Sequence, residues 1–381
     1  MAHADDLPPS SAPPEENRRW WDELDPARRD TFLAQPPTEL GARDGLPAEV
    51  RDAANRAALD RHIERTDDPD AVLLRDSIGS TTAPPHQRSY LLRFEPPSTT
   101  GATDALVAVS MGQPDTADRT CVYVPGATNT MGNIDYGIDF ARQLKSEVDA
   151  HSDGHATSAC VVWLGYNAPD SAVPGALRRQ PAREGGERLN EFLAGLAAST
   201  TIPPSDRSTT VYGHSYGSVV VGNAATGDRA FHASRVVVAG SPGMGRHVRS
   251  ARDLNVPEGQ VFAAAADLDV VTHAPRVIHG TDPASREFGA RVFSAEQGGH
   301  EAYFPQGSGG MRNLRNIVTG RLDRVRYVEP RVTSGLTAIM RTPELRQSVK
   351  DRAAQAGGKD GAPQFRSRRG PPSVDRRGPR R

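Results

Sequence analysis

The chain has 381 residues with 46 basic and 47 acidic side chains, so its formal net charge is −1. No run of about 18 apolar residues occurs in it, which excludes a membrane-spanning helix. Near-neutral charge, with no basic patch interleaved with aromatic residues, argues against a dedicated nucleic-acid-binding protein. The composition is typical of a soluble globular protein.

The two ends of the chain differ in composition from the middle. Residues 1–15 are rich in Pro and Ser and lack both a positively charged start and an apolar stretch, so no secretory signal peptide is expected. Residues 346–381 carry eleven Lys or Arg and three Asp, a net charge of +8 that leaves about −9 on the rest. Both ends have few large apolar residues, and we expect them to be disordered. We expect a cytoplasmic protein whose basic tail is solvated or contacts polyanions weakly.

Residues 16–87 are expected to form a helical arm. The helical pattern is clearest in residues 16–66, where Pro47 is expected in the first turn of a helix. Trp20 and Trp21 lie within a charged stretch, and we expect them to anchor the arm on the main domain. A lid or a substrate contact is the alternative role for this pair.

Residues 88–345 are expected to form one α/β domain. Apolar, strand-like runs alternate with helical segments, which is typical of a mostly parallel sheet covered on both faces. The first two runs are close enough to pair as a hairpin. Eight runs are predicted to be strands: 90–95, 105–111, 121–124, 159–166, 208–213, 235–240, 260–266 and 290–294.

The segment Thr209–Gly222 contains G-x-S-x-G between a β-branched strand and a small-residue helix. This is the context of a nucleophile elbow, in which the serine takes a strained conformation at the carboxyl edge of the sheet. Gly213 and Gly217 would let the strand and the helix approach each other. Ser215 is therefore the candidate nucleophile, and the simpler alternative is a tight turn whose serine caps the helix.

A serine hydroxyl needs a base to take its proton. After a nucleophile elbow, an acidic residue precedes that base along the chain. Directly after the strand predicted at 260–266 come two aspartates, Asp267 and Asp269. We favour Asp269, because it lies in the loop past the strand and before an apolar pair. Asp267 and Asp282 remain alternatives.

The base should lie in the loop after the last strand. His300 follows two glycines there and is our candidate. His279 and His273 fit this position less well, and His214 lies inside the elbow, where a residue packs under the nucleophile.

A tetrahedral intermediate needs two backbone N–H donors. We expect one from Tyr216, the residue after the nucleophile, and one from Ala127, where Gly126 permits the chain to bend toward Ser215. An ordinary Pro-Gly turn is the alternative reading of the second loop.

Other chemistries find little support in the sequence. No metal-binding spacing and no phosphate loop of the G-x-x-x-x-G-K-[ST] type occurs, so no cofactor and no metal is expected. The glycine-rich segment Gly240–Gly245 has a central proline and is expected to line the site. Cys121 and Cys160 are expected to be structural thiols, with a disulfide as the lesser alternative.

These features resemble the α/β-hydrolase superfamily, and more narrowly a bacterial α/β-hydrolase family of unknown function. The narrower resemblance spans roughly residues 16–322 and rests on segments that include WWDELDP, VPGATNT, VVWLGYNAP, GHSYGS, GSPGMG, DLDVV and GGHEAYF. It implies the triad Ser215, Asp269 and His300. Leu268-Asp269-Val270 stands where the family pattern has Gly-Asp-Pro, so Asp267 stays open as the acid. The segment Gly165–Pro169 either shapes the acyl pocket or caps a strand.

The resulting hypothesis is a serine hydrolase that cleaves an ester, thioester or amide through an acyl-enzyme, with a small-molecule acyl compound as substrate. Because an alcohol can resolve the same acyl-enzyme, an acyltransferase is an alternative. A non-catalytic binding module on this fold is the other.

Overall fold

A computed structural model describes residues 7–97, 104–152, 156–171, 178–227, 229–265, 279–295, 300 and 303–331. Within them the chain forms an eight-stranded sheet in the order β1-β2-β4-β3-β5-β6-β7-β8. Strand β2 is antiparallel to both of its neighbours, and the other neighbouring pairs are parallel. The strands are β1 (Ser89–Glu95), β2 (Leu106–Met111), β3 (Arg119–Val124), β4 (Ser158–Leu164), β5 (Ser208–His214), β6 (Arg235–Ala239), β7 (Val261–Ala265) and β8 (Arg291–Ser294). The predicted strands and the predicted hairpin of the first two are confirmed.

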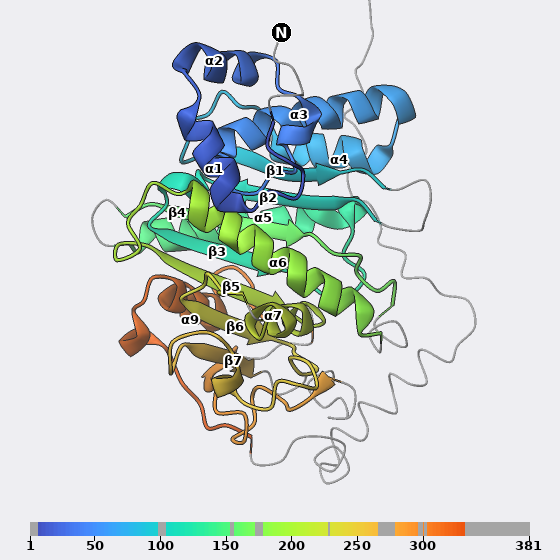
Figure 1. Cartoon of the computed structure of the whole chain (residues 1–381). Helices are drawn as coiled ribbons and strands as arrows, with labels where there is room; N and C mark the ends of the chain where they lie inside the picture. Colours follow the sequence, from blue (N-terminus) through green and yellow to red (C-terminus); the bar gives the residue numbers. More distant parts are fainter. Residues whose placement is uncertain are drawn as a thin grey trace, which may run out of the picture. The chain divides into compact units, whose positions relative to one another are not determined.

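Helices cover both faces of this sheet (Figure 1). In Figure 1, α6 (Gln180–Ser199) and α7 (Gly217–Ala225) lie in front of the sheet, and α5 (Ile134–Ala150) and α9 (Gly309–Val318) lie behind it. Each face has its own apolar core. The strands are buried on both sides, which is why they read as continuous apolar runs rather than alternating ones.

Four further helices precede the sheet in the chain: α1 (Pro14–Glu23), α2 (Pro26–Ala34), α3 (Ala48–Thr66) and α4 (Pro69–Ile78). Pro47 is the N-cap of α3 and lies one position before the first turn in which we expected it. Helix α4 continues the arm beyond the predicted helical pattern. Short 3-10 turns complete the described structure: η2 (Thr38–Leu40), η3 (Pro114–Thr116), η4 (Met131–Asn133), η6 (Ala251–Asp253) and η8 (Leu322–Arg324).

The expected disorder of residues 1–15 does not hold for residues 7–15. Helix α1 begins at Pro14, Ala12 is buried, and Arg43 donates a hydrogen bond to the Pro9 carbonyl at 2.9 Å. A low apolar content did not prevent order here, because the segment packs against the arm rather than forming a core of its own. Residues 346–381 lie outside the described residues.

The tryptophan pair packs differently from our expectation. Trp21 is buried in a cluster with Phe32 and Leu40, and Trp20 packs against the same cluster. The buried members of this cluster all belong to the arm, so the pair holds the arm's own helices together instead of anchoring them on the main domain.

Helix α3 lies along β1, the first strand of the sheet (Figure 1). The Asn55 side chain donates to the Leu91 carbonyl at 2.9 Å and accepts from the Phe94 amide at 3.2 Å. The Asp52 carboxylate accepts from the Leu91 amide at 2.7 Å. Side chains of one helix thus satisfy backbone groups that a neighbouring strand would otherwise pair with.

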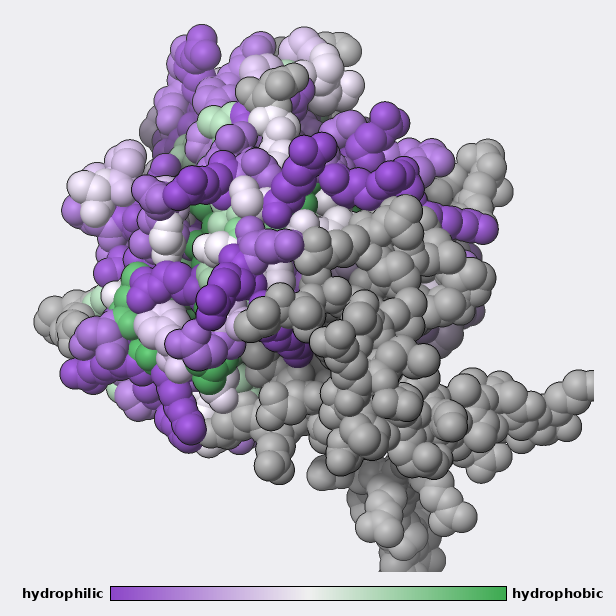
Figure 2. Space-filling view, turned by 90° about the horizontal axis from the view of Figure 1, so that it is seen from below, coloured by the Kyte–Doolittle hydropathy of each residue, from purple (hydrophilic) through white to green (hydrophobic). Residues whose placement is uncertain are grey.

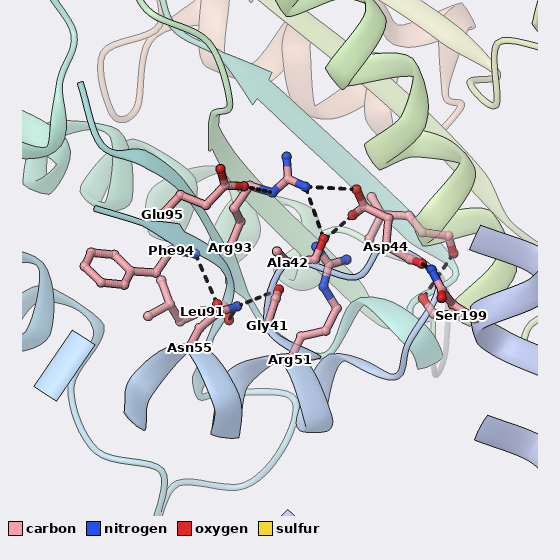
Figure 3. A network of polar contacts seen from close by, with 12 residues as sticks. Gly41, Ala42, Asp44, Arg51, Asn55, Leu91, Arg93, Phe94, Glu95 and Ser199 are labelled. Carbon is pink, nitrogen blue, oxygen red and sulfur yellow. Dashed lines mark hydrogen bonds and ion pairs between the residues drawn. The ribbon is translucent and has the colours of Figure 1, made fainter. Parts of the chain in front are cut away.

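A buried ionic cluster joins the same arm to β1 (Figure 3). Asp44 lies between two arginines: its Oδ1 is 2.7 Å from Arg51 Nη2, and its Oδ2 is 3.3 Å from Arg93 Nη2. The side chains of Asp44 and Arg51 are only 3% and 2% exposed. Burial lowers the pKa of Arg51, and the Asp44 carboxylate opposes that shift.

The face seen in Figure 2 is largely hydrophilic, with hydrophobic residues visible between the polar ones. No helix in the described part of the chain is long and apolar enough to cross a membrane.

Candidate active site

Ser215 stands in a sharp turn between β5 and α7. Its φ of +52° lies in the left-handed region, which a non-glycine residue occupies only when the surrounding structure enforces it. A Cβ at Gly213 would lie 2.8 Å from Ser218 Cα, and one at Gly217 would lie 2.1 Å from the Val124 carbonyl oxygen. The two glycines are therefore needed for close approach, as the motif predicts, and the turn has the geometry of a nucleophile elbow.

His300 lies next to this serine. Its Nε2 is 2.9 Å from Ser215 Oγ, within hydrogen-bond distance, and both residues are half-buried. His214 lies just before the serine and is buried, and its Nε2 is 2.9 Å from the His300 carbonyl oxygen. His214 thus holds the backbone of His300, while the imidazole of His300 faces the serine.

The loop after β3 also reaches the serine. A Cβ on Gly126 would lie 2.7 Å from Ser215 Cβ and 3.2 Å from Ser215 Oγ. The φ of Gly126 is not positive, and the left-handed residue of this loop is Thr128, with φ of +67°. Glycine is required at position 126 for lack of space beside the nucleophile.

Hydrogen bonds hold this loop in place. The Tyr166 hydroxyl donates to the Pro125 carbonyl at 2.6 Å, and Asn129 Nδ2 donates to the Gly126 and Ala127 carbonyls at 3.2 and 3.1 Å. Within the described residues, the amides of Ala127 and Tyr216 donate to no protein acceptor. Two backbone donors next to the nucleophile are thereby left for another acceptor.

The residues flanking this site include a stack of aromatic rings. Tyr166 and Tyr216 stack with ring centroids 6.3 Å apart, and the His279 ring meets Tyr216 edge-on at 5.8 Å. The Tyr216 hydroxyl donates to the Arg178 carbonyl. Burial raises the pKa of Tyr216 to about 12, so its hydroxyl stays protonated and serves as a donor, not as a base.

Beneath the elbow, two buried serines join it to the glycine-rich loop after β6. The Ser218 and Ser241 hydroxyl oxygens are 2.7 Å apart, and Ser218 Oγ also donates to the Ser215 carbonyl at 2.6 Å. Ser241 in turn bonds both the amide and the carbonyl of Gly243. This loop therefore supports the elbow through hydrogen bonds, and its role in lining the site stays a prediction.

The structure describes only one of the three candidate acids, Asp282. Asp267, Asp269 and also His273 lie outside the described residues. Asp282 is described and buried: it accepts from the Ala284 amide at 2.8 Å and lies 3.4 Å from Arg331 Nη1. These contacts give Asp282 a role in a turn.

Sequence reasoning missed two contacts of this site. The sequence predicts a pocket or a strand cap at Gly165–Pro169, whereas the Tyr166 hydroxyl fixes the loop that carries Ala127. His214 was expected only to pack under the nucleophile, but it binds the His300 backbone. Across the described ranges, no three His, Cys, Asp or Glu side chains gather where they could hold a metal ion.

Comparison with known proteins agrees with the fold. Residues 100–279 match a protein-family model described as alpha/beta hydrolase. Together with the mostly parallel sheet and the strand-turn-helix elbow, this match shows that the chain has an α/β-hydrolase fold.

Two relatives come from Mycobacterium tuberculosis. The uncharacterized protein Rv2079 is 28% identical over 383 aligned positions, which cover 83% of this chain and 57% of the relative. The uncharacterized protein Rv0963c is 34% identical over 163 positions, which cover 41% of this chain and 59% of the relative. The chain thus spans less than two thirds of the length of both relatives.

The solved structures that are similar to this chain include two enzymes. One is a serine hydrolase without a lid from Xanthomonas campestris, at 14% identity and a TM-score of 0.35, covering 62% of this chain and 94% of that one. The other is an arylesterase, at 10% identity and a TM-score of 0.39, covering 70% of this chain and 97% of that one.

Proposed function

We propose that the chain is a serine hydrolase of the esterase type, which cleaves a carboxylic ester or a related thioester or amide through an acyl-enzyme. One observation carries the proposal: a serine held at φ +52° in a strand-turn-helix elbow has its Oγ 2.9 Å from the Nε2 of a histidine. A nucleophile paired with a base at this distance is the arrangement that acyl transfer requires.

The first half-reaction follows from this geometry. Ser215 Oγ attacks the substrate carbonyl carbon while His300 Nε2 accepts the hydroxyl proton. The carbonyl oxygen becomes an oxyanion, which the amides of Tyr216 and Ala127 stabilise. His300 then returns its proton to the leaving alcohol, thiol or amine, and the acyl group stays on Ser215.

In the second half-reaction, water gives a proton to His300 and attacks the carbonyl carbon of the acyl-enzyme. His300 then returns the proton to Ser215 Oγ as the bond to the acyl group breaks, which releases the acid and restores Ser215. An alcohol in place of water would make the enzyme an acyltransferase. Asp269 is our candidate for the acid that orients the imidazolium, and Asp267 is the alternative.

Labelling with a fluorophosphonate probe tests the nucleophile. We expect the wild type and a control variant at an exposed serine, Ser205→Ala, to be labelled, and Ser215→Ala and His300→Ala to lose labelling. Labelling of Ser215→Ala at the wild-type rate would disprove the assignment.

Turnover of p-nitrophenyl esters of increasing chain length, and of the matching thioesters, then tests the reaction. If the folded wild type reacts with the probe but turns over none of them, a binding role on this fold is favoured instead. Of the single variants Asp269→Asn and Asp267→Asn, we expect only the first to lower kcat by about 10⁴.

A further inference from the structure

A cavity of about 460 Å³ lies beside the elbow helix, between the start of α6, helix α7 and the loop after β6. Its lining is strongly basic and includes Arg179 and Arg183 from the α6 side, and Arg246 and His247 from the loop after β6. These four side chains are exposed, so a ligand can reach them from solvent.

The cavity adjoins the candidate active site. Val219 of helix α7 lines the cavity and lies about one helical turn along the chain from Ser215, which precedes the helix. His279 lines it as well, and its ring packs edge-on against Tyr216, whose amide is our proposed oxyanion donor. Tyr216, whose ring contacts this cavity-lining histidine, directly follows the reacting serine in the chain.

The charges around the cavity are not balanced. No aspartate or glutamate lines it, and the guanidinium groups of Arg179, Arg183 and Arg246 form no ion pair with any carboxylate in the described part of the chain. Glu184 is close by, but it accepts its hydrogen bond from Gln180 Nε2, at 2.8 Å. Three like charges around one hollow repel one another in the absence of an anion.

We propose that this cavity binds a phosphate group, and that the natural substrates of the Ser215 site carry that group. The second part rests on the function proposed above. A phosphate dianion matches more than one guanidinium, since each presents a planar pair of N–H donors to two phosphate oxygens. The phosphate would hold the substrate next to the elbow while its acyl carbon reaches Ser215.

The first experiment measures binding without catalysis. Calorimetry with inorganic phosphate and with phenyl phosphate is carried out on the full chain carrying Ser215→Ala, alone and combined with Arg179→Gln, Arg183→Gln and Arg246→Gln. We expect the triple substitution to weaken binding roughly tenfold or more, and added salt to weaken it in the parent.

A matched triple variant removes the same charge elsewhere: Arg75→Gln, Arg252→Gln and Arg286→Gln. Each of these arginines is exposed and lies within 4 Å of a carboxylate oxygen in an ion pair. It should bind phosphate as the parent does. Equal weakening in both triple variants, or no binding by the parent, would overturn the site; in the first case the protein holds an adventitious ion only.

The second experiment identifies the source of the phosphate. Acetate esters of ω-hydroxyalkyl phosphates of increasing length are each compared with the neutral alkyl acetate of equal length. We expect a higher kcat/KM for the phosphate ester at one or more lengths, and loss of that preference in the Arg179, Arg183 and Arg246 variant, with neutral esters hydrolysed at unchanged rates.

The phosphate site and the proposed function can be disproved independently by these two experiments. Phosphate binding that depends on the three arginines, without any preference among turned-over esters, overturns the substrate assignment and favours a free phosphate ligand. No turnover of any ester, with binding intact, contradicts the proposed function and leaves the phosphate site standing.

Discussion

Arginines serve opposite purposes in two regions of this molecule. Where the arm meets β1, Arg51 and Arg93 are buried and share the Asp44 carboxylate (Figure 3). Around the cavity beside α7, Arg179, Arg183 and Arg246 are exposed and pair with no carboxylate in the described ranges. A buried charge must be compensated within the fold, whereas an exposed charge is solvated and stays available to bind a ligand.

Charge at the arm junction therefore stabilises the fold, whereas charge around the cavity serves recognition. Removing the anion of the first region should destabilise the folded protein, because the buried Arg51 guanidinium would lose its carboxylate in a place that excludes water. Substitutions at the catalytic edge should instead change reactivity and leave folding nearly intact. Four variants test this division.

The largest effect is expected at the arm junction. Asp44→Asn keeps the shape of the side chain but leaves the buried Arg51 without its ion-pair partner, and Arg93 with only the more exposed Glu95. We therefore expect the free energy of unfolding to fall by about 3–5 kcal/mol. Urea denaturation measures it. In the control, Asp22→Asn removes an exposed partner of Arg18 and should cost about 1 kcal/mol or less. Equal losses in the two variants would contradict the division.

Beside the nucleophile Ser215, we expect added side-chain volume to lower activity more than a change of charge would. Gly126→Ala places a methyl group 2.7 Å from Ser215 Cβ, and we expect kcat/KM to fall by about 10² because the nucleophile is displaced. Gly227→Ala is the control, since the nearest atom to its added methyl group is 3.9 Å away. Esterase assays on both folded proteins measure the effect, and wild-type activity of Gly126→Ala would refute the close approach.

A smaller loss is expected from the hydroxyl that holds the loop of Ala127. Tyr166→Phe removes the hydrogen bond to the Pro125 carbonyl and should lower kcat by about tenfold while KM stays unchanged, because the loop acts on the oxyanion. The exposed Tyr136→Phe serves as control. A rise of KM with constant kcat would make Tyr166 a contact of the substrate rather than a positioning residue.

The smallest effect is a gain in stability at the nucleophile. Ser215→Gly relieves the strain of φ +52°, so we expect the free energy of unfolding to rise by about 1 kcal/mol while probe labelling is lost. Ser215→Ala keeps its Cβ and should lose labelling without the gain. Thermal unfolding of the two variants separates strain from chemistry, and identical stability would argue that the turn is relaxed.

The fold could be predicted because its signals are local. The eight apolar runs became eight strands within one or two residues at most ends, and G-x-S-x-G between a strand and a small-residue helix gave the elbow. Contacts between distant segments left no such signal. The bond from Tyr166 to Pro125 spans 41 positions and the bond from His214 to His300 spans 86, and neither shows in a pattern of spacing.

The arm shows the same limit. Its helices were predicted from periodicity, but the packing of Trp21 within the arm and the order of residues 7–15 depend on partners that no short window contains. Placement of Asp267 and Asp269, and of the basic tail, stays a prediction, as do the boundaries of the arm and the domain at residues 87 and 345.

The contacts of α3 with β1 also bear on how the protein behaves in concentrated solution. An edge strand offers unpaired N–H and C=O groups to any strand that meets it, and proteins that leave such an edge open tend to stack into aggregates. Here Asn55, with one donor and one acceptor on a single amide, pairs with this edge at Leu91 and Phe94 much as a further strand would. Helix α3 thus covers the edge of the sheet at β1. Without the arm this edge would be open, and we expect a second molecule to pair with it.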